Sequence, residues 1–480
     1  MRPSVRLAAR VLLAALGAIV VIRPALAQDL ALRTRRIEDS LLPRILIAGE
    51  PAVTSSLADR MAHYRVPAVS VAVLNDGAIE WARAWGLADV AAGRRATVET
   101  LFQAASISKP VAATAALALV EEGRLDLDTD VNGYLTSWQV PDSAVAQGER
   151  VTVRRLLTHT AGVTVHGFPG YARTERIPTA VEVLDGNGNT DPVRVSVKPG
   201  SMWRYAGGGY TVLQVLLADL TGTRFDLLMR ERVLEPAGMT LSTYESPLPQ
   251  DRWEEAATGY RADGAPVEGS WHVYAEQAAA GLWTTPSDLA RWGLAILTAH
   301  DGTEGGVLSP AMARQMLTPG LNGWGLGPSV HPARLHFGHG GANEGFRCAL
   351  IVFFDGRGAV IMTNSDRGAG LASEILGTLA VAYGWPDLKP SEKTVAAVDR
   401  AGYAALAGTY RVEARGIEAV VEVEGVKLYM RGTGIGRAEL LPESETVFFS
   451  REDGTRVTFI REDGRIVALT AGGLRAVKTK

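Results

Sequence analysis

The chain has 480 residues, of which 47% are hydrophobic and 21% are charged, and its formal net charge at pH 7 is −3. These values are typical of a globular protein, and they exclude a collagen-like or largely disordered chain. So small a net charge also gives no reason to expect nucleic acid or another polyion as a partner. The length favours one large enzyme-sized domain with a smaller domain attached to it.

The chain begins with a pattern that is typical of a secretory signal. Three arginines among the first ten residues precede an apolar run over 11–22, and Ala25-Leu26-Ala27 follows as a small-residue cleavage site. The apolar run is shorter than the ~20 residues that span a bilayer. We therefore predict a signal peptide over residues 1–27, cleaved near Ala27, and a periplasmic or secreted bacterial protein with no stable membrane span. Retention as an N-terminal anchor is the alternative.

After the signal, the predicted elements alternate between strands and helices. Residues 55–63 have a helical pattern, and a mostly helical region with Gly- and Pro-containing connections extends from 102 to about 297. Strands are predicted at 68–74, 78–86, 335–340, 346–354 and 359–364. Strands at both ends of a region, with helices between them, predict an α+β fold. We expect an antiparallel sheet flanked by helices, together with an α-rich lobe.

A linker and a small β domain are predicted at the end of the chain. Residues 385–393 are polar and contain two prolines. From residue 408 onward, short β-rich runs alternate with turns that include Asp453-Gly454 and Asp463-Gly464. We therefore predict a large domain over 28–388, a linker over 389–407 and a C-terminal β-sheet or barrel domain over 408–480.

One Ser-x-x-Lys motif, from Ser106 to Lys109, opens a helical pattern. Side chains three residues apart lie on the same face of a helix, and Pro110 is suited to the first turn. Ser106 would then lie near a helix N-terminus, where developing negative charge is favoured. A serine hydroxyl needs a base to become a nucleophile, and a lysine can be that base only when its surroundings keep it neutral or a partner relays the proton.

The scarcity of lysine makes Lys109 more informative. Between residues 28 and 384 the only lysines are Lys109 and Lys198, although arginines are abundant. Arginine carries the same charge but cannot act as a base. The alternative is a surface lysine that happens to follow a serine, because an isolated Ser-x-x-Lys arises often by chance.

Two further segments, with a third in support, make a chance match improbable. Residues 198–210 hold Tyr205 in a Gly-rich stretch, residues 337–346 hold His339-Gly340-Gly341, and Thr158-His159-Thr160-Ala161-Gly162 precedes both. In this order, over about residues 55–382, they resemble the serine β-lactamase-like family. That family includes class C β-lactamases, DD-carboxypeptidases, D-aminopeptidases and some carboxylesterases. The resemblance implies a β-lactamase/transpeptidase-like fold for 28–388.

The resemblance also implies a role for each of these residues. Ser106 would attack the substrate carbonyl, Tyr205 would accept and donate the proton, and Lys109 would hold the proton network that they share. Positive charge on Lys109 would favour the phenolate of Tyr205. The triplet from His339 to Gly341 would lie on an inner strand along which the substrate backbone runs. The N–H groups of Ala342 and Ser106 would form the oxyanion hole.

Two positions depart from the pattern of the family. Gly207 stands where relatives carry the asparagine of Tyr-x-Asn, so that an amide is missing. His339 stands where many β-lactamases carry a lysine, so that a fixed cation is replaced by a group with a pKa of about 6.5. Both changes predict weaker recognition of β-lactams and of substrate carboxylates.

The remaining histidines have simpler interpretations. His159 lies in a stretch that the family uses structurally, and we interpret it as a hydrogen-bonded structural residue. His331, His336 and His339 are close in sequence, but no carboxylate spacing of a metal site accompanies them. The chain also lacks the Gly-x-Ser-x-Gly elbow of α/β-hydrolases. We therefore expect no metal and no organic cofactor.

Together these patterns predict a secreted serine hydrolase that forms an acyl-enzyme with small amide or ester substrates. Its partner would be a small molecule or a short peptide. Two alternatives stay open. One is a carboxylesterase for short-chain esters, because the same three residues cleave esters. The other is a non-catalytic protein that binds penicillin or wall peptides and does not turn them over.

Overall fold

The computed structural model describes residues 30–412, 416–432 and 435–479. The predicted signal peptide lies outside these residues. None of the helices in the described ranges is both long and apolar enough to cross a membrane. The chain divides into two compact units, one of residues Met61–Ala372 and one that combines Met1–Arg60 with Ser373–Lys480. Helices α2 (Leu57–Tyr64) and α11 (Gly368–Ala382) run across the two sequence boundaries.

The unit Met61–Ala372 contains a seven-stranded antiparallel sheet with the order β4-β3-β2-β12-β11-β10-β9. Its strands are β2 (Ala68–Asn75), β3 (Ala78–Asp89), β4 (Arg94–Arg95), β9 (Ser329–His331), β10 (His336–Asn343), β11 (Phe346–Phe353) and β12 (Gly358–Thr363). The two ends of the region meet where β2 pairs with β12, with Val71 opposite Ile361. The predicted sheet of distant segments is thereby confirmed. Seven of the eight residues of β2 are buried, which explains its unbroken apolar sequence.

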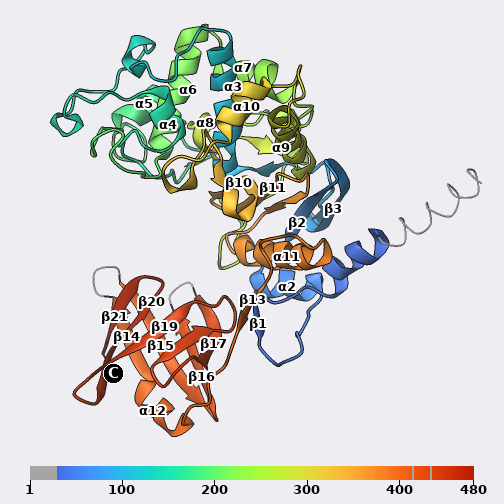
Figure 1. Ribbon diagram of the computed structural model, residues 1–480, viewed down its shortest axis with the longest axis vertical. Helices are drawn as coiled ribbons and strands as arrows, with labels where there is room; N and C mark the ends of the chain where they lie inside the picture. The colour runs from blue at the N-terminus through green and yellow to red at the C-terminus, as the bar shows by residue number, and fades with distance from the viewer. Residues whose placement is uncertain (1–29, 413–415, 433–434, 480) are drawn as a thin grey trace, which may run out of the picture. The chain divides into compact units, whose positions relative to one another are not determined.

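Helices alternate with long connections between β5 and β9. They are α3 (Ser108–Glu121), α4 (Val153–Leu157), α5 (Ala180–Asp185), α6 (Gly207–Thr221), α7 (Phe225–Met229), α8 (Gln277–Ala280), α9 (Pro286–His300) and α10 (Pro310–Met316). Two short antiparallel pairs join β5 (Phe102–Gln103) to β8 (Trp283–Thr284) and β6 (Tyr171–Ala172) to β7 (His272–Val273). Helix α9 packs across the sheet, whereas α3 is buried on almost every side within the helical lobe (Figure 1). The predicted α+β fold is confirmed.

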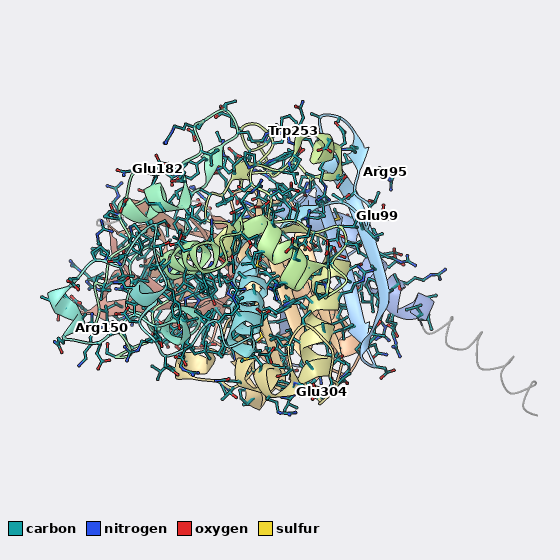
Figure 2. All side chains as sticks on the ribbon, turned by 90° about the horizontal axis from the view of Figure 1, so that it is seen from above. Arg95, Glu99, Arg150, Glu182, Trp253 and Glu304 are labelled. Atoms are coloured by element: carbon teal, nitrogen blue, oxygen red, sulfur yellow. The ribbon has the colours of Figure 1, made fainter. Side chains whose placement is uncertain are left out.

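Several charged side chains of this unit lie at its outside. Figure 2 shows Arg95, Glu99 and Arg150 at the periphery of the fold, and all three are exposed. Lys109 is an exception, because only 2% of its surface is accessible. A charged residue is rarely buried to this degree unless it is paired or its charge is removed.

The C-terminal region is a closed eight-stranded barrel, drawn in orange and red in Figure 1. Its strands are β14 (Gly408–Val412), β15 (Ile417–Glu424), β16 (Lys427–Gly432), β17 (Ile435–Pro442), β18 (Val447–Ser450), β19 (Arg456–Glu462), β20 (Arg465–Ala471) and β21 (Leu474–Lys478). The predicted β domain is confirmed, although the sequence pattern did not reveal β17 and β21. The barrel core is filled by large side chains such as Tyr410, Phe448 and Phe459, and α12 (Tyr403–Leu406) packs against it.

The segment predicted as a linker carries structure of its own. Its residues 391–393 form β13 (Ser391–Lys393), which pairs in parallel with β1 (Ile45–Ile47). Ile45 and Ile47 are buried in a small apolar cluster with Phe449 of the barrel. The N-terminal segment and the barrel are therefore parts of one unit.

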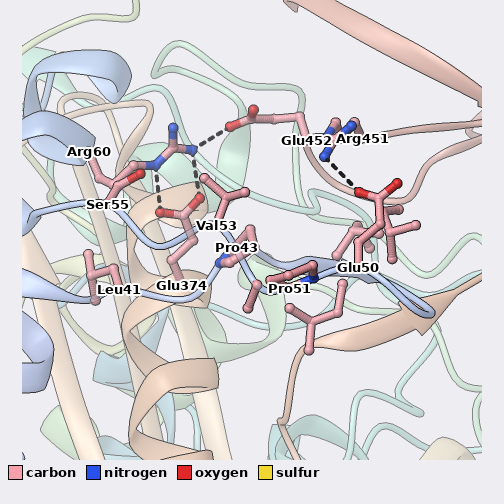
Figure 3. A pocket seen from close by; sticks show the side chains of 14 residues that line it. Leu41, Pro43, Glu50, Pro51, Val53, Ser55, Arg60, Glu374, Arg451 and Glu452 are labelled. Carbon is pink, nitrogen blue, oxygen red and sulfur yellow. Dashed lines mark hydrogen bonds and ion pairs between the residues drawn. The ribbon is translucent and has the colours of Figure 1, made fainter.

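An ion-pair network lies in the same unit (Figure 3). Arg60 donates two hydrogen bonds to the buried carboxylate of Glu374, at 2.8 and 2.6 Å, and a third to Glu452 at 2.7 Å. Since Glu374 belongs to α11 and Glu452 follows β18, one guanidinium ties a helix to the barrel.

Candidate active site

The turn before α3 holds Ser106 in a defined position. Ser106 lies in the short helix η1 (Ala105–Ile107), directly before α3, and it is partly exposed although its neighbours are buried. Ala105 has a φ of +50°, which is unusual for a residue with a side chain. The hydroxyl of Ser108 donates to the Ala105 carbonyl at 2.5 Å and accepts the Leu282 N–H at 3.0 Å. These bonds fix the strained turn that presents Ser106.

Lys109 lies within hydrogen-bond distance of Ser106. Its Nζ donates to the Ser106 Oγ at 3.0 Å and to the Ala279 carbonyl of α8 at 2.8 Å. Burial lowers the pKa of Lys109 from 10.5 to about 7, because a charged ammonium is poorly solvated there. Near neutral pH a large share of Lys109 is therefore a neutral amine, which can accept the proton of Ser106.

Tyr205 completes the group around the serine. The side chain of Ser106 lies close enough to the Tyr205 hydroxyl to lower the pKa of that hydroxyl, and the Lys109 Nζ lies 5.0 Å from the centre of the Tyr205 ring. Burial raises the pKa of Tyr205 well above its usual value of 10, and this outweighs the opposing effect of the nearby Ser106. Tyr205 is thus a phenol at neutral pH, and the phenolate that the sequence led us to expect is not its resting form. Of the two groups on Ser106, Lys109 is the better proton acceptor.

Strand β10 brings the predicted glycines beside this turn. A Cβ atom on Gly341 would lie 2.3 Å from the Ala104 carbonyl oxygen, so the strand and the turn approach each other closely. β9 pairs with β10 only at residues 336–338, and it leaves the strand edge beyond Gly338 uncovered. Gly340 and Ala342 are exposed there. This geometry is compatible with a substrate backbone along the edge and with the predicted oxyanion hole.

His339 is neutral and presents an acceptor to Tyr205. Its Nδ1 lies 2.5 Å from the Gly340 carbonyl oxygen, which can only accept, so that Nδ1 carries the proton. Its Nε2 lies 3.5 Å from the Tyr205 hydroxyl. Burial, together with the nearby Lys109, lowers the pKa of His339 to about 3. Nε2 is therefore unprotonated at neutral pH, and it offers no donor to a substrate carboxylate, which agrees with the weaker carboxylate recognition that we predicted.

The space beside Gly207 is already occupied. Gly207 is the first residue of α6, and a Cβ there would lie 2.8 Å from the Phe168 ring and 3.1 Å from the His166 carbonyl oxygen. The asparagine of the family could enter only if this loop moved.

His159 has the structural role that we predicted for it. The His159 Nδ1 accepts the Ala206 N–H at 3.2 Å, just before α6 begins. The ring of His159 lies 4.2 Å from that of Tyr205. His159 therefore holds Tyr205 in place through the hydrogen bond to the next residue, Ala206, and through the ring contact.

The sequence reasoning missed an aromatic cluster around Tyr205, which we define as Trp203, Tyr205, Trp324, His159 and His339. The Trp324 ring lies 5.7 Å from that of Tyr205 and 5.4 Å from that of His339, and Trp203 lies 5.5 Å from Trp324. No spacing rule links residue 324 to residue 205. The only signal in the sequence is that Trp203 lies two positions before Tyr205.

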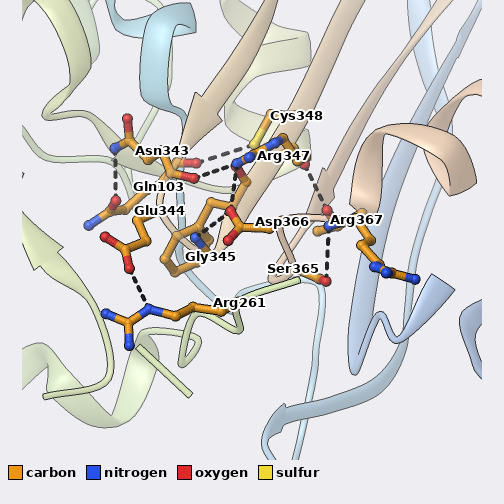
Figure 4. A network of polar contacts seen from close by, with 12 residues as sticks. Gln103, Arg261, Asn343, Glu344, Gly345, Arg347, Cys348, Ser365, Asp366 and Arg367 are labelled. Atoms are coloured by element: carbon orange, nitrogen blue, oxygen red, sulfur yellow. Dashed lines mark hydrogen bonds and ion pairs between the residues drawn. The ribbon is translucent and has the colours of Figure 1, made fainter. Parts of the chain in front are cut away.

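A polar network fixes the far end of β10 (Figure 4). Asn343 donates to Gln103 at 2.8 Å and to the Ala280 carbonyl at 3.1 Å. Glu344 accepts from Arg261 at 2.5 Å. β10, β5 and α8 are thereby held together next to the serine.

The residues of this site do not include a metal centre. In the ranges that the structure describes, no three His, Cys, Asp or Glu side chains gather as metal ligands. His331 and His336 are in ring contact at 5.0 Å.

Two family models and several known proteins match most of the chain. The family model described as "Beta-lactamase" matches residues 53–382, and that described as "Domain of unknown function (DUF3471)" matches residues 392–475. Penicillin-binding protein 4* of Bacillus subtilis (strain 168) is 27% identical over 413 residues, which cover 81% of this chain and 89% of the relative. A D-aminopeptidase of Brucella anthropi is 26% identical over 430 residues, which cover 85% and 74% of the two chains.

A solved structure has the same fold. The octameric penicillin-binding protein homologue from Pyrococcus abyssi superposes with a TM-score of 0.60 at 24% identity, over 88% of this chain and 98% of that one.

Proposed function

The chain belongs to the beta-lactamase family of serine hydrolases, and we propose that it is an exported enzyme that hydrolyses small amides or esters through an acyl-enzyme on Ser106. The observation that carries this proposal is the 3.0 Å bond from the Lys109 Nζ to the Ser106 Oγ. Because burial brings the pKa of Lys109 to about 7, that bond joins a nucleophile to a usable base. The arginines and the apolar run before Ala27 support export.

The reaction follows from these contacts. Neutral Lys109 accepts the proton of Ser106 as the Oγ attacks the substrate carbonyl. The oxyanion is stabilised by backbone N–H groups, for which those of Ser106 and Ala342 are the candidates. Tyr205, beside Ser106, passes a proton to the departing amine or alcohol, and the proton that Lys109 took from Ser106 replaces it. Water then attacks the acyl-enzyme, and the same groups return the proton to Ser106.

Turnover is a better explanation of this site than binding alone. A protein that only held wall peptides would need neither a strained turn before Ser106 nor a buried lysine beside it. Both features cost stability, and both serve the attack by Ser106, because the turn presents its hydroxyl and the lysine can take its proton. The short-ester alternative uses the same three residues, so the two substrate classes are best separated by measurement.

Covalent labelling tests the proposal directly. The wild-type protein and a Ser106→Ala variant are treated with a fluorophosphonate and with a penicillin, and the intact mass is measured together with the thermal unfolding midpoint. We expect the wild type to gain one adduct and to hydrolyse at least one substrate among p-nitrophenyl esters, nitrocefin and D-residue peptides. The variant should unfold at a similar temperature and form no adduct. Labelling of a folded Ser106→Ala protein would remove Ser106 from the mechanism.

A further inference from the structure

We propose that this enzyme selects substrates whose leaving group carries no carboxylate, and that an apolar part of that group stacks on Trp324 and Trp203. The inference rests on the proposed function, because it takes Tyr205 as the proton donor to the leaving group. The inference specifies the chemical class of the leaving group, which membership of the family does not determine.

The position of the leaving group follows from Tyr205. When the tetrahedral intermediate collapses, the bond from the carbonyl carbon to the leaving oxygen or nitrogen breaks, and that atom needs a proton. The donor is the Tyr205 hydroxyl, which lies beside the side chain of Ser106. The departing atom must therefore lie within hydrogen-bond distance of this hydroxyl. The Nε2 of His339 is 3.5 Å from the same oxygen, so the leaving group also faces His339.

Aromatic rings surround this position. Trp324 makes edge contacts with both Tyr205 and His339, at interplanar angles of 77° and 89°. Trp203 lies 6.4 Å from Tyr205, and both tryptophans are partly exposed. A substituent on the departing atom therefore meets indole surface, on which aromatic and apolar groups pack well.

Three cations in this part of the fold already donate to acceptors of the protein. Lys109 is occupied by Ser106 and by the Ala279 carbonyl. Arg204 donates to the carbonyls of residues 162 and 163 and to Ser196. Arg347 donates to the carbonyl of Asn343 and pairs with Asp366 at 3.0 Å. A substrate carboxylate would therefore have to compete with these bonds.

His339 adds a direct repulsion against a carboxylate on the leaving group. Its Nε2 is an acceptor, so it repels a carboxylate oxygen and favours an N–H or O–H of the substrate. A carboxylate placed against the Nε2 of His339 loses water and meets a second acceptor there, which disfavours it. The site therefore discriminates against β-lactams, whose departing amine carries a carboxylate, and against peptides cut before a free C-terminal residue. It accepts esters and amides of neutral alcohols and amines.

Two aryl esters that differ only in charge test this selection on the wild-type protein. We compare 4-carbamoylphenyl butyrate with 4-carboxyphenyl butyrate, and each kcat/KM is divided by the rate constant for hydroxide hydrolysis of the same ester. Both form the same butyryl-enzyme, so the ratio reports the leaving group alone. We expect the neutral ester to be favoured by about tenfold or more. Equal values, or a preference for the carboxylate, would overturn the proposal.

A tryptophan variant tests the stacking. Trp324→Leu should lower the corrected kcat/KM for the 4-carbamoylphenyl ester by about tenfold, and change that for the 2,2,2-trifluoroethyl ester by less than about twofold. The matched control is Trp253→Leu, because Trp253 is also partly exposed but packs on Arg173 at the periphery (Figure 2). Trp253→Leu should leave the corrected kcat/KM unchanged for both esters. An equal loss for both esters in Trp324→Leu would show a structural role and contradict the stacking.

Fluorophosphonate labelling shows whether a negative result contradicts only the inference about the leaving group or also the proposed function. If Ser106 takes up a fluorophosphonate and the neutral and charged esters are cleaved equally, only the inference about the leaving group is wrong. If Ser106 takes up no fluorophosphonate and neither ester is cleaved, the proposed function is wrong, and the inference is overturned with it. The comparison of the two aryl esters needs no variant, so it decides the matter even where Trp324→Leu does not fold.

Discussion

The chemistry of Lys109 depends on burial as much as on its spacing from Ser106. Its pKa falls from 10.5 to about 7, so the reactive amine form increases as pH rises through about 7. We therefore expect kcat/KM to rise with pH along a single limb centred near 7. Lys109→Arg should lower kcat/KM by about 10²- to 10⁴-fold, as much as Lys109→Ala does, because arginine stays protonated. Activity of the arginine variant near that of the wild type would make Lys109 an electrostatic anchor.

The buried carboxyl of Glu276 makes the stability of the protein depend on pH. It is fully buried, and neither of its carboxyl oxygens has a hydrogen-bond partner among the described residues. Burial raises its pKa from 4.5 to about 7. Between these pH values the folded protein holds a proton that the unfolded chain has released, so this group makes stability fall as pH rises.

We expect the free energy of unfolding of the wild type to decrease by about 3 kcal/mol, relative to Glu276→Gln, between pH 4.5 and pH 8. Denaturant unfolding at the two pH values measures the difference, with Glu99→Gln on the exposed surface as the control. Parallel pH dependences of the wild type and Glu276→Gln would show that the carboxyl is solvated.

At the scale of elements, the close approach of β10 to the turn before Ser106 can be tested with neighbouring glycines. A Cβ on Gly341 would meet the Ala104 carbonyl oxygen at 2.3 Å, whereas one on Gly340 has its nearest atom at 3.9 Å. Gly341→Ala should therefore destabilise the protein by about 1–3 kcal/mol and slow the labelling of Ser106. Gly340→Ala should leave the thermal midpoint unchanged. Similar midpoints for the two variants would mean that the strand can shift at little cost.

Local patterns predicted the elements well where neighbouring residues decide the structure. The turn Asp76-Gly77 gave the hairpin of β2 and β3, and the Ser-x-x-Lys spacing put Ser106 beside Lys109. The acceptor of Lys109 could not be predicted in this way, because the Ala279 carbonyl comes from a helix 170 residues away. Backbone carbonyls leave no trace in residue identity, and the contact of Trp324 with Tyr205 is likewise purely tertiary.

At the scale of the whole molecule, composition located the small β domain but not its attachments. Residues 389–407 were predicted as a linker because they are polar and contain proline. In the structure, part of this segment is β13, and its partner β1 lies more than 340 positions earlier in the chain. Three-residue strands have too little pattern to be found from sequence. The barrel is consequently not a free appendage of the chain, because Ile45 and Ile47 are buried against Phe449.

This attachment changes what truncation is expected to do. A chain that ends at Lys389 lacks β13 and the barrel, and it uncovers Ile45 and Ile47, which are 6% and 8% exposed in the full protein. All proposed active-site residues lie within Met61–Ala372. We therefore expect residues 28–389 to label at Ser106 but to aggregate, because an exposed strand edge with two isoleucines favours association.

The same fragment with Ile45→Ser and Ile47→Ser should regain solubility and label to the same extent per mole. Light scattering and fluorophosphonate labelling of the two fragments give the comparison. If the serine fragment stays soluble but does not label, the barrel contributes to the active site. If both fragments are equally soluble, the two isoleucines find cover without the barrel, and the contact with Phe449 is dispensable.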